Sequence, residues 1–113
     1  MIEEQYVSLD TAKLLKEAGF DVPCRGGYHV NRFRYEAPTQ ALAARWLREV
    51  HHINVYACFD YVCFDNGERK WFFMRENTMI NDYTSVYCSI ISYDSYEQAL
   101  EEGLQEAVKL IKK

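Results

Sequence analysis

The stretch HHINVYACFDYVC, residues 51–63, holds the side chains of this sequence that are best suited to chemistry. Two histidines and two cysteines in so short a segment are the residue types that bind zinc. If residues 53–64 form one regular strand, however, alternation points Cys58 and Cys63 to opposite faces. One zinc ion could not easily bind both, because a zinc–sulfur bond is only about 2.3 Å long. The pattern therefore favours an apolar strand with no metal and no cofactor.

A catalytic role for the same histidines and cysteines has little support in the sequence. His51 and His52 follow a predicted helix, where an imidazolium ion favourably meets the negative end of the helix dipole. Cysteine is often simply buried, and no signature beside Cys58 or Cys63 indicates an activated nucleophile. The segment CRGGYH, residues 24–29, also lacks the spacing of a phosphate-binding loop. We therefore expect a protein that is not an enzyme.

Aromatic side chains are more informative, since the chain has 9 Tyr, 6 Phe and 2 Trp, many of them in predicted strands. Trp71 and Phe73 share one face of their strand, whereas Phe72 and Met74 share the other. If helices cover only one face of the sheet, the second face meets either water or a partner. The alternative is that loops or the last helix cover that face. The predicted interaction surface consists of Tyr56, Trp71, Phe73 and Tyr87.

Charge limits the partners that the protein could bind. The net charge of −4 repels nucleic acid and anionic membranes. Residues 25–48 are the exception, because this segment contains five arginines and one acidic residue, Glu36, which gives it a local charge of +4. Binding of nucleic acid thus remains the alternative to binding of an unknown protein partner or a second copy. Its candidate contacts are Arg32, Arg34, Arg45 and Arg48, with Arg25 beside them.

No segment suggests a membrane protein or a secreted one. The longest uncharged stretch, residues 83–93, is too short and too polar to span a bilayer. The N-terminal residues MIEEQYVSLD lack the basic start and apolar run of a signal peptide. We therefore predict a cytoplasmic protein whose 4 cysteines are free thiols rather than disulfides.

Local signals predict two helices and a strand in the first half of the chain. Ser8 and Gly19 are typical start and stop residues for a helix over residues 9–18. Residues 28–35 alternate like a strand, with a phase slip that we interpret as a bulge. A second helix is predicted over residues 39–51, beginning at Pro38 or Thr39.

The second half predicts a hairpin, a further strand and a long helix. Asn66-Gly67 is a strong turn signal within a hairpin over residues 53–75, and SVYCSIISY, residues 85–93, supplies another strand. The last helix starts at Asp94, which has capping-box spacing to Glu97. Its small residues Ala99, Gly103 and Ala107 indicate either close packing or a tolerated glycine.

These elements predict one α+β domain over residues 1–113. Successive strands with short connections form an antiparallel sheet of three to four strands, with the helices on one face in a two-layer arrangement. The order of the last five elements matches that of double-stranded RNA-binding domains. Such domains place basic residues at the start of the final helix, whereas this helix opens with DSYEQALEEGLQE. That difference argues against RNA binding.

Three stretches carry a resemblance to known proteins: LDTAKLLKEAGFDVPC, APTQALAARWLREVHHINV and YEQALEEGLQEAVKLI. They resemble a family of small uncharacterised proteins from phages and other mobile elements of gut bacteria, over most of the chain. The resemblance implies no assigned activity, so no functional residue is carried over. The last stretch is also similar to the helix that follows the antiparallel sheet of HicB antitoxins, and no toxin-binding or DNA-binding residue matches there.

Overall fold

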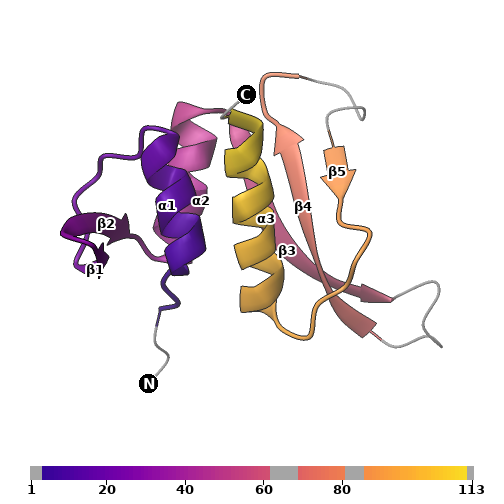
Figure 1. Ribbon diagram of the computed structural model, residues 1–113. Helices are drawn as coiled ribbons and strands as arrows, with labels where there is room; N and C mark the ends of the chain where they lie inside the picture. The colour runs from indigo at the N-terminus through magenta and orange to yellow at the C-terminus, as the bar shows by residue number, and fades with distance from the viewer. Residues whose placement is uncertain (1–3, 62–68, 81–85, 112–113) are drawn as a thin grey trace.

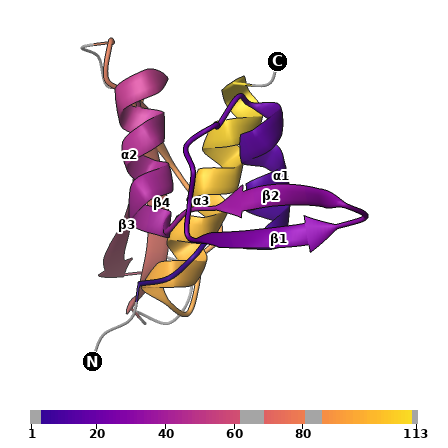
Figure 2. The same cartoon turned by 90° about the vertical axis from the view of Figure 1, so that its left-hand side faces the viewer.

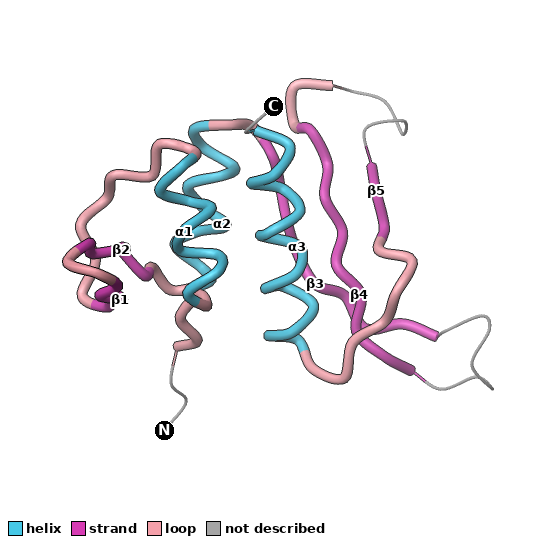
Figure 3. Tube along the Cα trace, in the orientation of Figure 1, coloured by secondary structure: helices cyan, strands magenta, loops and turns pink. Residues whose placement is uncertain are grey.

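The computed structural model describes residues 4–61, 69–80 and 86–111. Two antiparallel sheets and a set of helices form the described part of the chain (Figure 1, Figure 3). The α+β class, the antiparallel pairing and the packing of helices on a sheet confirm the prediction. In chain order the elements are α1 (Leu9–Glu17), β1 (Gly26–Val30), β2 (Phe33–Ala37), α2 (Gln40–Val50), β3 (Ile53–Tyr61), β4 (Arg69–Asn77), β5 (Val86–Cys88) and α3 (Tyr96–Ile111).

Helices and the larger sheet form two layers around one core. Figure 1 shows α3 lying across the sheet β3-β4-β5, with α1 and α2 beside it. Leu15, Leu47 and Leu104, one from each helix, are fully buried where the helices meet. The smaller sheet, β1-β2, packs against α1 and projects from the body of the molecule (Figure 2).

The first helix has the ends that the sequence predicts. The Ser8 hydroxyl accepts a hydrogen bond from the Thr11 amide, which satisfies one of the free N–H groups of the first turn. Gly19 follows the helix with a φ of 96°, in the left-handed region that glycine adopts without strain. The helix spans Leu9–Glu17, with Ala18 as its C-cap.

The segment predicted as one bulged strand over residues 28–35 is instead a two-stranded hairpin. Tyr28 pairs with Tyr35 and Val30 with Phe33. The phase slip is a tight turn, since Asn31 and Arg32 have φ values of 50° and 72°. Two consecutive residues with positive φ are typical of the turn that best matches the twist of paired strands. Asparagine is common at the first of these two positions, but arginine is rare at the second, where glycine is usual.

The second helix begins and ends close to where the sequence predicts. Thr39 caps α2 by accepting a hydrogen bond from the Leu42 amide, and the helix ends with His51 as its C-cap. The His51 ring packs edge-on against Trp46, with 4.7 Å between ring centroids. His51 therefore closes the helix against an aromatic side chain of the core.

The predicted hairpin is formed by β3 and β4, which pair from Ile53 with Asn77 to Tyr61 with Arg69. Its predicted turn at Asn66-Gly67 lies outside the described residues. Only Val86–Cys88 of the predicted strand over residues 85–93 pairs with β4 as a strand. After Cys88 the Ser89 amide still donates to the Phe73 carbonyl, but the Phe73 amide donates to the Ser89 hydroxyl instead of to a backbone carbonyl. A further isolated bridge to β4 joins Tyr93 to Trp71.

The last helix begins one or two residues later than predicted and lies very close to the sheet. Ser95, rather than Asp94, supplies the side chain that accepts from the first turn, at the Gln98 amide. A Cβ placed on Gly103 would lie 2.9 Å from Phe73 Cβ and 2.9 Å from Val55 Cγ1. The close packing that the small residues indicated is thus confirmed, and Gly103 is where α3 touches the sheet.

None of the helices within the described residues combines the length and the apolar character that are needed to cross a membrane.

Candidate functional site

The two faces of the larger sheet differ in what covers them. Val55 and Phe73 meet Gly103, so the odd-numbered side chains of β3 and β4 face α3. Even-numbered side chains of these strands face the opposite way, because successive side chains of a strand alternate. We refer to this second side as the outer face.

This arrangement divides the predicted interaction surface. Trp71, Phe73 and Tyr87 lie on the side of α3, and only Tyr56 lies on the outer face. Phe73 is 3% exposed and packs beneath α3, so it belongs to the core and its assignment to an exposed surface is wrong. Trp71 is held edge-on against Tyr96 with 5.4 Å between ring centroids. Tyr87 stacks near Phe73 at the free edge of the sheet and remains half-exposed.

The outer face is apolar although no other described element packs on it. Tyr56 and Val86 are each 37% exposed, and Cys88 is exposed as well. Its polar groups lie at the two ends: the Asn54 amide donates to the Glu76 carboxylate at 3.0 Å at one end, and Lys70, 3.6 Å from Asp94, lies at the other. Sheet faces that meet water normally carry polar side chains. The apolar residues of the outer face are Tyr56, Cys58, Phe72, Met74, Val86 and Cys88.

Partial burial already affects the chemistry of the outer face. Burial raises the pKa of Tyr56 above its ordinary value of 10.0, and the nearby Glu76 carboxylate raises it further. The phenol is therefore neutral across physiological pH and offers a hydroxyl on an otherwise apolar surface. Such a side chain is well suited to a protein interface.

The histidine and cysteine cluster does not assemble a site in the described part of the chain. Cys58 lies on the outer face, and Cys63 lies outside the described residues. No group of three or more metal-binding side chains occurs among the residues that the structure describes.

The predicted arginine contacts separate into two places. Arg32 and Arg34 belong to the β1-β2 hairpin, whereas Arg45 and Arg48 belong to α2. Figure 2 shows α2 at the left of the molecule and the hairpin extending to the right, away from it. One continuous nucleic-acid surface made from all four arginines is therefore not formed.

Arg34 has a structural role in the hairpin. Its Nη2 donates to the Cys24 and Gly26 carbonyls at 3.0 and 3.3 Å, and its Nε pairs with Glu36 at 3.0 Å. The hydrogen bond from Arg34 lowers the pKa of Glu36, and the Cys24 amide lowers it further. The guanidinium lies directly over Gly27, where any side chain would collide with it. Arg34 therefore holds the loop before the hairpin in place.

The sequence reasoning missed a cationic and aromatic surface between α1 and the hairpin. Lys16 lies 4.9 Å from the Tyr35 ring centroid and 5.4 Å from that of Phe33, which is 60% exposed. Lys13 also lies over Tyr35. Exposed cation–π contacts of this kind contribute about 0.5–1 kcal/mol each.

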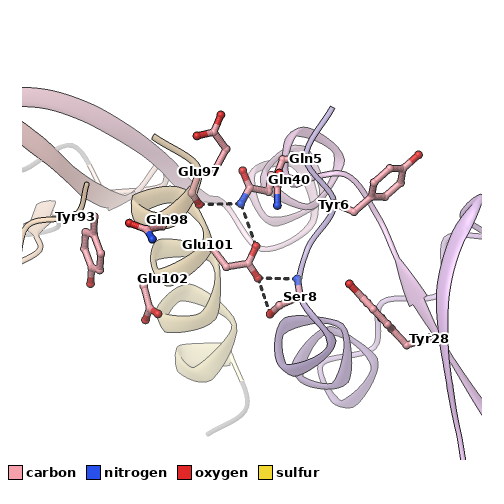
Figure 4. Close-up of a pocket in the computed structure, with 10 residues that line it drawn as sticks. All are labelled: Gln5, Tyr6, Ser8, Tyr28, Gln40, Tyr93, Glu97, Gln98, Glu101 and Glu102. Carbon is pink, nitrogen blue, oxygen red and sulfur yellow. Dashed lines mark hydrogen bonds between the residues drawn. The ribbon is translucent and has the colours of Figure 1, made fainter. Parts of the chain in front are cut away.

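The sequence reasoning also missed a polar network centred on Glu101 (Figure 4). Its Oε2 accepts from the Ser8 amide and hydroxyl, both at 2.9 Å, and from the Thr11 hydroxyl. Its Oε1 accepts from Gln40 Nε2 at 3.0 Å, and that amide also donates to the Glu97 carbonyl. One carboxylate thus joins the N-terminal ends of α1 and α2 to α3. No sequence motif marks this glutamate.

A shallow cavity of about 460 Å³ lies over this network. Tyrosine side chains border it, and its lining includes no Lys, Arg or His. In Figure 4, Tyr93 and Glu102 lie on one side of α3, whereas Ser8 and Tyr28 lie on the other. The volume is within the range of small-ligand sites, but the cavity is open and its central carboxylate is already bonded. The lining residues are Gln5, Tyr6, Ser8, Tyr28, Gln40, Tyr93, Glu97, Gln98, Glu101 and Glu102.

Comparison of the chain with protein-family models, with curated proteins and with solved structures finds no match.

Proposed function

We propose that this is a non-enzymatic, cytoplasmic binding protein that associates with a second copy of itself through the outer face of its sheet. The observation that carries the proposal is the apolar outer face, which no other described element covers. Burying apolar surface is the main source of association energy, at about 25 cal/mol per Å². The free thiol of Cys24 suits a reducing compartment.

Two identical outer faces have the chemistry for packing on each other. Antiparallel sheets commonly pack face to face, about 10 Å apart, through interdigitating apolar side chains. Tyr56, Phe72 and Met74 would form the centre of such an interface, with the Asn54 and Glu76 pair at its border. An interface of this kind keeps charge at the rim, as protein interfaces generally do.

Sedimentation analysis over a range of concentrations tests the proposal. We expect the wild-type chain to dimerise, and Tyr56→Glu or Met74→Glu to shift it to monomer, because a carboxylate would be buried without a partner. Phe33→Glu is the matched control, since Phe33 is exposed on the hairpin and away from the outer face. Circular dichroism checks that each variant remains folded.

A wild-type chain that stays monomeric at every concentration would contradict self-association. If Phe33→Glu dissociates the dimer and the outer-face variants do not, the interface lies at the hairpin instead.

Nucleic-acid binding remains a second candidate because of the Lys13, Lys16 and Phe33 surface. Aromatic rings beside cations are typical of single-stranded nucleic-acid sites. The surface would bind a labelled oligonucleotide with steep salt dependence, and Lys16→Glu would abolish that binding. Binding that is insensitive to salt, or unchanged in Lys16→Glu, would exclude this candidate.

A further inference from the structure

Two adjacent isoleucines between β5 and α3 are exposed to an unusual degree. Ile90 is 90% exposed and Ile91 is 68% exposed. They border a cavity of about 270 Å³, together with Phe73, Tyr87, Ser89, Tyr93, Glu102 and Glu106. Large apolar side chains gathered at a cavity mark an interaction site more often than scattered ones do.

The loop that carries the isoleucines is fixed in this position. Ser89 is buried, its amide donates to the Phe73 carbonyl at 2.9 Å, and its hydroxyl donates to the Ile91 carbonyl at 2.9 Å. At the other end, Tyr93 exchanges two backbone hydrogen bonds with Trp71, at 2.7 and 3.0 Å. The loop is therefore tied to β4 on both sides of the two isoleucines, which lowers the entropic cost of binding a partner there.

The cavity beside the isoleucines adjoins the acidic cavity over α3, because Tyr93 and Glu102 line both. We refer to these two neighbouring cavities together as the groove. Neither lining includes Lys, Arg or His. Two cations lie near its isoleucine end: Lys109 is 3.9 Å from Glu106, and the Arg75 guanidinium lies over Tyr87. The groove is thus apolar at one end and acidic at the other, where Glu97, Glu101 and Glu102 gather.

Tyr93 connects the two ends of the groove. Burial raises the pKa of its phenol, and Glu102 and Glu106 raise it further, which agrees with a position beside both carboxylates. A hydroxyl in that position can donate to a carboxylate while the ring contacts an apolar group.

We propose that this groove is a docking site for a partner-protein segment in which an apolar pair is followed by basic residues. The apolar pair packs on Ile90, Ile91 and the Tyr93 ring. The basic residues then reach Glu97 and Glu102, where their charge is complementary to the groove and incompatible with an acidic competitor. The acidic end repels nucleic acid and anionic lipid for the same reason. This site is separate from the outer face, which lies on the other side of the sheet.

The probe for the test is a capped peptide with two leucines, two serines and two lysines, titrated into the ¹⁵N-labelled chain and followed by NMR. Its counterpart has two glutamates in place of the lysines. We expect the basic peptide to shift the amide signals of residues 89–93 and of the first half of α3, and the acidic peptide to bind at least about fivefold more weakly.

Variants separate specific docking from general charge attraction. The Ile90→Ser, Ile91→Ser double variant and the Glu97→Gln, Glu102→Gln double variant should each weaken the basic peptide about fivefold. The matched control, Asp21→Asn with Glu49→Gln, removes the same charge outside the groove and should leave binding unchanged. Equal weakening by the control, equal binding of both peptides, or no shifts in the groove would overturn the proposal.

The test also distinguishes this site from the proposed dimer interface. Tyr56→Glu should leave peptide binding intact, so loss of dimerisation with retained binding separates the two surfaces. If the isoleucine double variant instead converts a dimer to a monomer, a second copy occupies the groove and the peptide proposal is wrong.

Discussion

Gly103→Ala tests whether α3 really lies in contact with the sheet, because two effects of opposite sign compete there. Replacing glycine by alanine inside a helix stabilises it by about 1 kcal/mol. The added Cβ would, however, lie 2.9 Å from both Phe73 Cβ and Val55 Cγ1, whereas carbon atoms in contact are about 3.5–4.0 Å apart. Phe73 Cβ cannot turn away, because it is bonded directly to the backbone of β4.

Relief of this overlap requires α3 to lift from the sheet along its middle turn. That movement loosens Ala99 and Ala107, which are fully buried on the same side of the helix. Overpacking of a core costs about 1–3 kcal/mol. The steric cost therefore exceeds the helix gain, and we expect a net destabilisation of about 1 kcal/mol.

Urea unfolding, followed by tryptophan fluorescence, measures the effect. The midpoint should fall by about 0.3–1 M, since the dependence on urea is about 1–3 kcal/mol per M for small proteins. Glu106→Ala and Glu106→Gly provide the control, because their difference gives the helix propensity at an exposed position of the same helix. Stabilisation by Gly103→Ala that equals this difference would refute close packing at Gly103.

The network at Glu101 and the pairing of Glu36 lead to two further predictions. Glu101→Ala leaves the buried Thr11 and Gln40 side chains without this acceptor and should destabilise the fold by about 2–4 kcal/mol. Glu101→Gln should destabilise it by about 1–2 kcal/mol. Equal stability of the wild type and both variants in urea would contradict the network. The pKa of Glu36 is lowered in the folded state, so its contribution to stability is present above its ordinary value of 4.5 and is lost as the pH falls through the folded value. Glu36→Gln should therefore be less stable than the wild type at neutral pH and equally stable in acid. A difference between the urea midpoints of the two proteins that is the same at both pH values would refute this pairing.

Local signals in the sequence predicted the elements of the fold well. Ser8, Gly19 and Thr39 act within a few residues of themselves, so their capping and helix-ending roles could be read directly. The hairpin at Asn31 and Arg32 was missed because arginine occupies the second turn position, where glycine is usual, although Asn31 is typical of the first.

The surfaces were harder to predict, because both faces of β3 and β4 are rich in apolar residues. Alternation shows that Trp71 and Phe72 point in opposite directions, but it does not show which of them meets the helices. Glu101 could not be recognised either, since it lies on a helix rich in glutamate and its partner Ser8 is 93 residues away. Contacts between residues so far apart produce no periodic pattern in the sequence.

The bond between Ser8 and Glu101 has a consequence for the way the chain acquires its structure. Ser8 caps α1, and Glu101 belongs to α3, which the ribosome makes after the other described elements. The first helix thus lacks its carboxylate partner until α3 has emerged, and contacts of such wide separation in sequence are slow to form. The amino-terminal half is therefore expected to await the carboxyl-terminal helix during synthesis, and a nascent chain that stops before residue 96 should remain sensitive to protease throughout.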